Sequence, residues 1–384
     1  MFLSQSRHIT HLDLDTFYVS VEYLRNSKLR GKPVLIGGMS DRGVVASCSY
    51  EARKFGIHSG MPMRAARRLC SNAVVIKSDF EAYSKYSKLV TEVIKEEVPV
   101  FEKASIDEFY VDLTGMEKFF GCRKLSDKLK NKVYKESGLS ISYGLASNKL
   151  ISKVATNEIK PNGQLEIPFG NEKNFLAPLS IMKIPGIGKE TGYKLLKMGV
   201  ETVKTLSEIP VNMMNNLLGK NGIELHKRAN GIDESPVIPF KEAKSISTEQ
   251  TFETDTIDIN FIYRQLTRMT EKIAFELRSK NQLTGCVSVK IRYSDFQTEQ
   301  RQISIAYVAA DHILFKKAKE LFDKLYERRQ LIRLIGVRFS NLIPGNYQID
   351  LFNDTQENIR LYQAIDSIKK QYGEKLLIHA AGYV

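Results

Sequence analysis

Three carboxylates stand in segments of the sequence that otherwise favour burial. Asp13 lies in HITHLDLDTF, and Asp107 and Glu108 lie at the centre of VFEKASIDEFYVDL. A charge within a strand is costly to bury unless it is paired or binds a cation. If the two strands lay side by side, divalent ions held there could polarise a phosphate and lower the pKa of an attacking hydroxyl. The spacing alone leaves open that each carboxylate lies on an exposed face or in a salt bridge.

The charge of the chain points to a polyanionic partner, since the formal net charge is +13 and the pI is about 9.3. The net charge is +7 over 1–168, +2 over 169–240, +5 over 241–345 and −1 over 346–384. Residues 91–112, which include Asp107 and Glu108, run against this trend at −5. In a basic chain, a cluster of carboxylates either binds cations or forms an acidic face exposed to solvent. Composition alone does not distinguish these two alternatives.

Length and composition narrow the class of protein. At 384 residues the chain is too long for one core, so about two to four domains are expected. With 42% hydrophobic and 26% charged residues it reads as globular. No apolar run approaches the roughly 20 residues of a membrane span, and the N-terminus lacks a signal peptide's apolar core, so a cytoplasmic protein without a membrane partner is expected. The cysteines are too scattered for a C-x₂₋₄-C zinc site and are expected to be reduced, buried thiols.

Around the carboxylates, the hydrophobic patterns predict an α+β unit. Residues 11–15 alternate as a strand that a helix follows, and 81–98 have helical spacing. VFEKASIDEFYVDLTG predicts a hairpin with a short acidic centre. A helix over about 117–136, a strand over 139–147 and a helix over 148–159 complete the pattern. Strands with interleaved helices on one covering face make such a layer.

The rest of the chain divides into three further parts. From Phe169 to 240, short helices broken by Gly and Pro predict a small helical domain, and 238–252 is polar enough to be a linker. A second α/β pattern follows. The tail from 346 is separate and has apolar residues at helical spacing, without a role that we can assign. The second pattern consists of a helix at 258–279, strands at 286–295 and 297–308, a helix at 311–329 and a strand at 332–343.

A glycine-rich hairpin is predicted at the centre of the helical domain, in IPGIGKETGYKLLKMGV. Gly186 and Gly188 permit a tight turn, and Lys189 follows at a helix N-terminus that favours phosphate. Such a helix-hairpin-helix would contact the DNA backbone without reading bases. A purely structural turn is the alternative.

Four segments in order, HLDLDTFYVSVE, VVASCSYEARKFGIHSGMPMRAA, ASIDEFYVDLTG and YGLASNKLISKVATNEIKPNG, resemble Y-family DNA polymerases, closest to the bacterial DNA polymerase IV branch. The resemblance covers about 1–240 and extends more loosely to 345. It implies a right-hand polymerase that copies primer-template DNA from dNTPs with low fidelity, bypasses lesions and lacks proofreading. The implied parts are a palm (1–36 and 81–168), small fingers (37–80), a helical thumb (169–240), an α/β little finger (241–345) and a tail (346–384).

The resemblance also implies roles for individual residues. Asp13 and Asp107 would bridge two Mg²⁺ ions, Glu108 would complete the catalytic metal's site, and the Leu14 carbonyl would bind the nucleotide metal. Nucleotide binding would fall to Ser47, where the family often has Thr, to Tyr50 and Arg53 of SYEARKFG, to Lys160 of KPNG, and to Phe17 and Tyr18. An Arg fork and a Lys point charge both suit phosphate oxygens.

Two further implied functions concern the sugar and a protein partner. Tyr18 would exclude a ribose 2′-hydroxyl by clash, with Phe17 as the next candidate or simply a core residue. Gln348, Leu351 and Phe352 resemble the pentapeptide by which bacterial polymerases bind the sliding clamp, although a strand end packing on its own domain would look alike. A monomer is expected. The competing functions are a nucleotidyl cyclase, which needs no hairpin or clamp peptide, and an inactive DNA-binding scaffold, which needs no carboxylates.

Overall fold

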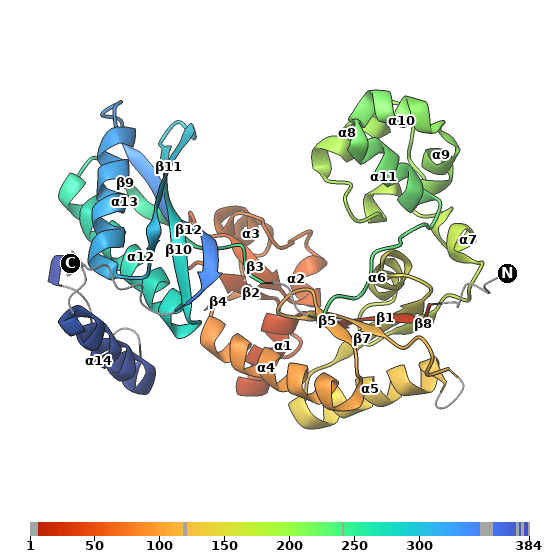
Figure 1. Ribbon diagram of the computed structural model, residues 1–384. Helices are drawn as coiled ribbons and strands as arrows, with labels where there is room; N and C mark the ends of the chain where they lie inside the picture. The colour runs from red at the N-terminus through yellow and green to blue at the C-terminus, as the bar shows by residue number, and fades with distance from the viewer. Residues whose placement is uncertain are drawn as a thin grey trace. The chain divides into compact units, whose positions relative to one another are not determined.

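A computed structural model of the chain describes residues 7–117, 121–239, 242–345, 356–373, 376–377 and 380–382. It divides into two compact units, Met1–Lys241 and Glu242–Val384 (Figure 1). The cysteines Cys48, Cys70, Cys122 and Cys286 are free and buried, as expected.

The first unit is built on a five-stranded sheet in the order β5-β6-β1-β7-β8. Strand β1 pairs antiparallel with both β6 and β7, which places it at the centre. The strands are β1 (Ile9–Leu14), β5 (Phe101–Lys103), β6 (Glu108–Asp112), β7 (Ile141–Ala146) and β8 (Gln164–Glu166). The helices beside them are α1 (Phe17–Arg25), α4 (Phe80–Glu97), α5 (Cys122–Ser137) and α6 (Lys149–Glu158).

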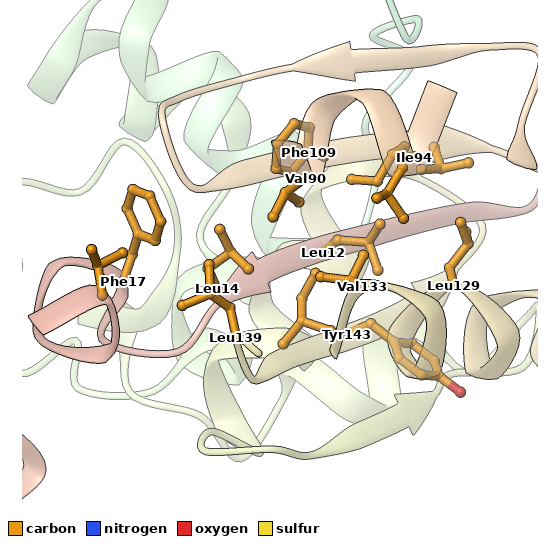
Figure 2. Close-up of a cluster of buried hydrophobic side chains, with 14 of the residues drawn as sticks. Leu12, Leu14, Phe17, Val90, Ile94, Phe109, Leu129, Val133, Leu139 and Tyr143 are labelled. Atoms are coloured by element: carbon orange, nitrogen blue, oxygen red, sulfur yellow. The ribbon is translucent and has the colours of Figure 1, made fainter. Parts of the chain in front are cut away.

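Helices cover both faces of this sheet, so the prediction of one covering face is wrong. On one face, Leu12 of β1 packs among apolar residues of α4 and α5 such as Val90 and Val133 (Figure 2). On the other face, His11 meets Thr156 of α6, which lies across the sheet from α4 and α5 in Figure 1. Every residue of β1 is therefore buried, including the polar ones.

A smaller sheet in the order β3-β2-β4 lies beside the first. Its own core includes Leu35, Val45 and Met63. Strand β2 crosses the predicted boundary between palm and fingers at residues 36 and 37. The elements are β2 (Val34–Gly37), β3 (Val45–Cys48), α2 (Tyr50–Arg53), α3 (Met63–Leu69) and β4 (Val74–Lys77), with η1 (Ser27–Leu29) before them.

Short helices form the next part, as predicted from the Gly and Pro breaks. Their core is aliphatic and is continuous with residues of α6 such as Ile151 and Val154. The elements are α7 (Glu172–Leu176), η2 (Ile181–Lys183), α8 (Lys189–Lys197), α9 (Val203–Glu208), α10 (Val211–Leu218) and α11 (Lys220–Ala229).

The second unit is a four-stranded sheet in the order β11-β10-β12-β9, with α12 and α13 packed on it. The expected linker over 238–252 is wrong from residue 245 onward, because β9 (Ser245–Thr256) pairs with β12 as an edge strand. The remaining elements are α12 (Ile259–Ser279), β10 (Gln282–Tyr293), β11 (Thr298–Val308), α13 (Asp311–Leu325) and β12 (Ile332–Pro344).

The tail forms a helix, α14 (Gln356–Tyr372), followed by η3 (Ala380–Gly382). Its buried residues are Tyr362, Asp366 and Lys369, while Leu361 and Ile368 are exposed. The face of α14 that packs on the second unit is therefore largely ionic. Lys369 Nζ lies 2.6 Å from Glu271 Oε1 of α12, and the Arg268 side chain donates to the Gly382 carbonyl at 2.5 Å.

Candidate active site

Asp13 and Glu108 lie opposite each other on neighbouring strands. Register pairs Asp13 of β1 with Glu108 at the start of β6, and the Leu14 amide donates to the Asp107 carbonyl at 3.0 Å. Asp107 lies in the turn between β5 and β6, which pair antiparallel, so the predicted hairpin with an acidic centre is confirmed and Asp107 is not within a strand. Ser105 Oγ donates to Asp107 Oδ1 at 2.6 Å and holds the turn. The hairpin therefore brings the predicted carboxylates to one end of the sheet.

Two lysines of the same region neutralise these carboxylates. Lys160 Nζ lies 2.5 Å from Asp13 Oδ2, and Lys153 Nζ donates to both oxygens of Glu108 at 2.7 Å. Lys153 comes from α6, and Lys160 comes from the loop that follows it. Since the Lys153–Glu108 pair is partly exposed, exchange of its partner for an ion costs little desolvation.

Asp13 is buried, with 4% of its surface exposed. Burial raises its pKa to about 7, Lys160 opposes the shift, and the charges of Glu108 and Asp107 add to it. A buried carboxylate that repels two others is a group that a cation would stabilise. The local charge is thus in excess: three carboxylates face two ammonium groups.

His11 adds a buried ring nitrogen beside these carboxylates, which the sequence argument missed. Its Nδ1 lies 2.9 Å from Thr156 Oγ1, whose hydrogen goes to the carbonyl of Ser152 or His11. When that hydroxyl donates to either carbonyl, Nδ1 is the donor to Thr156 and Nε2 carries a lone pair. That Nε2 is buried, has no hydrogen-bond partner and lies 3.9 Å from Glu108 Oε1. Burial lowers the pKa of His11 well below its usual value, and nearby lysines lower it further.

A divalent cation fits this donor set. One ligand atom each from His11, Asp13 and Glu108 lies within 4.8 Å of the others. Mg²⁺ is commonly held by one or two carboxylates together with phosphate oxygens and water. Asp107 is outside this close group, although its charge is felt by Asp13. The residues therefore suit an ion that arrives with a phosphate ligand and displaces the lysines.

The short helix α2 and the strand β3 before it carry three further predicted nucleotide-binding residues, Tyr50, Arg53 and Ser47. Arg53 lies over the ring of Tyr50, with its guanidinium carbon 4.9 Å from the ring centre. Tyr50 Oη is buried without a hydrogen-bond partner. Burial raises the pKa of Tyr50 to about 12, and the charge of Asp15 adds to the shift. Ser47, at the end of β3, is nearly buried. A phosphate oxygen would satisfy the orphan hydroxyl.

Tyr18 belongs to a cluster of aromatic rings. It stacks on Tyr83 with ring centres 4.4 Å apart and meets Phe80 edge-on. Burial raises the pKa of Tyr18, and the nearby Asp107 charge adds to it. Phe17 is 2% exposed and belongs to the sheet core, so its side chain offers nothing to a nucleotide. Of the two candidates, Tyr18 is the partly buried ring whose pKa burial and the Asp107 charge both raise.

The glycine hairpin has the predicted form. Gly186 has φ +98°, a left-handed conformation that strains any other residue, and a Cβ there would also displace the end of the Arg228 side chain, which lies 2.5 Å away. Gly188 is the N-cap of α8, and a Cβ there would meet no atom within 4 Å. Open space before a helix N-terminus suits close approach of a phosphate. Lys189, the first residue of α8, is exposed.

The structure adds residues that sequence reasoning missed and is silent on others. His11, Asp13 and Asp15 alternate along one strand and its end, which was the available signal for His11 and Asp15. Lysines on helices are common, so nothing marked Lys153. Gln348, Leu351 and Phe352 lie outside the described residues. No helix among those described is both long and apolar enough to cross a membrane.

Comparison with known proteins covers nearly the whole chain. The impB/mucB/samB family matches residues 12–157, its C-terminal domain matches 243–351, and a thumb domain described for DNA polymerase-iota matches 182–233. DNA polymerase IV of Dehalococcoides mccartyi strain BAV1 is 38% identical over 96% of this chain and 95% of its own length. The Treponema denticola DNA polymerase IV is 35% identical over 96% and 94%. A solved Y-family DNA polymerase chimera, Dbh-Dpo4-Dbh, has a TM-score of 0.78 at 26% identity, over 88% of this chain and all of the chimera.

Proposed function

This chain belongs to the Y-family of DNA polymerases and is a translesion DNA-directed DNA polymerase, and we propose that Asp13, Asp107 and Glu108 are its nucleotidyl-transfer site. The α+β fold with palm, fingers, thumb and little finger agrees with that family. Such an enzyme binds primer-template DNA and dNTPs and depends on divalent metal. The finer assignment of two Mg²⁺ ions is part of the proposal.

One observation supports the site above all others. Asp13 and Glu108 face each other on paired strands, and their oxygens are neutralised by Lys160 and Lys153 at 2.5 and 2.7 Å. Asp13 and Asp107 would bridge the two ions, Glu108 would complete the site of the catalytic ion, and the Leu14 carbonyl would bind the nucleotide ion. The bound ions would supply charge stabilisation and a more acidic primer hydroxyl.

In the reaction the primer 3′-oxygen forms a bond to the α-phosphorus of the dNTP while the bond to the β-phosphate oxygen breaks. The hydroxyl proton is lost and pyrophosphate leaves. On this proposal Lys160 exchanges Asp13 for a triphosphate oxygen, and Arg53 and the orphan hydroxyl of Tyr50 bind neighbouring oxygens. Ser47 adds a further hydrogen bond. These contacts orient the triphosphate in line with the primer terminus.

Steady-state primer extension with Mg²⁺ tests the triphosphate assignment. Lys160→Ala is expected to raise the KM for dNTP about tenfold or more, because a charge-assisted contact is lost. Lys128→Ala is the matched control, since Lys128 pairs with Glu97 on the outer helices α4 and α5. An unchanged KM in Lys160→Ala would remove Lys160 from the triphosphate site.

We also propose that the thumb hairpin grips the DNA backbone. Gly186 and Gly188 leave the backbone open, and Lys189 adds a charge at the same helix N-terminus. Counterion release then makes affinity fall steeply with salt. Lys189→Ala should lower the slope of log Kd against log salt by about one, measured by fluorescence anisotropy. An unchanged slope would contradict this contact.

We further propose that Gln348, Leu351 and Phe352 bind a bacterial sliding clamp. We also propose that the enzyme is a monomer, and that it is cytoplasmic because its substrate is DNA. The support is sequence resemblance alone. A short peptide acts through effective concentration. Leu351→Ala with Phe352→Ala should abolish stimulation by a loaded clamp and leave clamp-free extension unchanged, with exposed Leu376→Ala as control. Loss of thermal stability together with clamp-free activity would show a core role instead.

A further inference from the structure

Asp15 is a buried carboxylate next to the active site that has no part in the proposal above. It follows β1 directly, two residues after Asp13, and is 3% exposed. Three neutral donors hold it. Ser140 Oγ donates to Oδ2 and Ser142 Oγ donates to Oδ1, each at 2.7 Å, and the Asn162 amide donates to Oδ2 at 2.8 Å.

Through these bonds Asp15 ties the loop over 160–163 to the central strands. Asn162 is bound directly. Gly163 is bound through a relay, because its amide donates to Ser142 Oγ at 3.1 Å and that hydroxyl donates to Asp15. The loop is also gripped from outside, where Lys130 Nζ donates to the Asn162 carbonyl at 2.6 Å.

The loop begins with Lys160, whose ammonium group lies on Asp13 Oδ2. Asp13 and Asp15 thus hold the same loop at two points, one by the lysine side chain and one by the backbone. The charge of Asp15 also reaches the proposed triphosphate-binding residues, since it contributes to the raised pKa of Tyr50. A carboxylate only accepts, so three donors around two coplanar oxygens fix their mutual positions.

We propose that Asp15 is a positioning residue, which sets the 160–163 loop so that Lys160 reaches the triphosphate when it leaves Asp13. The inference rests on the proposed role of Lys160. It assigns Asp15 no contact with substrate or metal. A buried carboxylate held by neutral donors is costly to desolvate. This desolvation cost is explained if the position of the 160–163 backbone determines how the triphosphate is held.

Steady-state kinetics of Asp15→Ala and Asp15→Asn separate this role from others. Asp15→Ala leaves the Asn162 amide without its acceptor, so the KM for dNTP is expected to rise about tenfold with kcat within about threefold. Asp15→Asn should restore most of the KM, because its amide oxygen can accept from Asn162 while its NH₂ donates to Ser142 Oγ. A metal ligand or a charge effect predicts instead that Asn fails as badly as Ala.

A double variant distinguishes failure of this inference from failure of the Lys160 assignment. Asp15→Ala combined with Lys160→Ala should show the KM of Lys160→Ala alone, because both changes remove one contact. If Lys160→Ala raises the KM and the two effects multiply, the inference is wrong. If Lys160→Ala has no effect, the proposed triphosphate contact is wrong first.

Folding is controlled separately. Asp127→Asn removes a carboxylate of α5 that accepts from Tyr143 Oη of β7, the strand that also carries Ser142, and should leave the KM unchanged. Should Asp15→Ala melt below the assay temperature, Ser142→Ala is used instead, since it removes the relay to Gly163 and one bond to Asp15. A smaller rise in KM, with kcat preserved, is then expected, and an unchanged KM would overturn the proposal.

Discussion

Around Asp13 the charged groups meet in pairs that another partner can replace, whereas around Arg278 each nitrogen of the guanidinium already has its acceptor. Arg278 Nε and Nη2 donate to the two oxygens of Asp366 at 2.7 and 2.9 Å, and Nη1 donates to Asp311 and to the Ala309 carbonyl. The Asp13 region instead leaves His11 Nε2 and Tyr50 Oη unpartnered although both are buried.

The difference teaches what each cluster is for. Buried charge is costly in both places. At Arg278 the cost is offset by closed, bidentate geometry that binds α14 to α12 and α13, so the cluster is structural. Around Asp13, three carboxylates meet only two lysines, and the buried His11 Nε2 and Tyr50 Oη have no hydrogen-bond partner. A cation and its phosphate ligand would remove that cost, and the excess of carboxylates around Asp13 favours a binding site there.

The strongest way to break this comparison is to remove a carboxylate from the palm. Glu108→Gln should lower single-turnover extension at saturating Mg²⁺ by at least about a thousandfold, because a lost metal ligand costs several kcal/mol of transition-state stabilisation. Thermal melting should barely change, since Lys153 is partly exposed and can reach solvent. Extension at the wild-type rate would show that Glu108 is not a ligand and that the cluster is structural after all.

Removing the central charge of the Arg278 cluster should instead lower stability and leave catalysis intact. Arg278→Met leaves Asp311 and Asp366 buried without their cation, so the second unit should lose about 3–5 kcal/mol of unfolding free energy in urea. Arg301→Met is the control, because its ion pair with Glu327 is exposed and worth at most about 1 kcal/mol. Equal stability of the two variants would mean that the Arg278 cluster does not hold the tail.

Much of the site could be predicted from sequence because its elements follow clear periods. The strand around Asp13 and the hairpin before Glu108 alternate apolar and polar residues, and α4 has helical spacing. These patterns predicted the strand and the hairpin, whereas the meeting of the two carboxylates at one site followed only from the resemblance to Y-family polymerases. Strand β9 was not predicted from the sequence, for a physical reason. It is an edge strand with mostly exposed polar residues, and only Ile246 and Phe252 are buried, so no alternation marks it.

The tail shows a different limit. Apolar spacing predicted its helix, but the residues that pack are Tyr362, Asp366 and Lys369, while Leu361 and Ile368 are exposed. An ionic interface has no period that distinguishes it from a solvated face. The same holds for Lys153, which resembles any helix lysine until β6 places Glu108 beside it. Sequence patterns report burial of apolar atoms well and pairing of charges poorly.

A smaller effect compares two tyrosines. Tyr18 stacks on Tyr83. Tyr362, in contrast, has both of its faces of interaction occupied: its Oη lies 2.6 Å from His312 Nδ1, and the Arg278 guanidinium lies over its ring. Tyr18→Ala should improve incorporation of ribonucleotides relative to dNTPs about a hundredfold, since steric exclusion of the 2′-hydroxyl is lost. Tyr362→Ala should lower stability and leave sugar selection unchanged. Competition between rNTP and dNTP in primer extension measures both, and a preserved preference in Tyr18→Ala would shift the role to another residue.

The smallest effect should come from replacing a whole ion pair. Glu271 and Lys369 join α12 to α14 with a 2.6 Å contact, and both are buried. Buried pairs are often matched by apolar residues of similar size, so Glu271→Leu with Lys369→Met should change the unfolding free energy by no more than about 1 kcal/mol. Lys369→Met alone should cost more, because it removes the cation that lies 2.6 Å from the buried Glu271 carboxylate and keeps the carboxylate. Urea titrations of the wild type, Glu271→Leu, Lys369→Met and the double variant complete the thermodynamic cycle. Primer extension should be unaffected by the double change, because this pair stabilises structure and binds no ligand. If the double variant were worse than the single one, or lost activity while folded, the tail cluster would have a function beyond holding α14, and the distinction between the two clusters would fail.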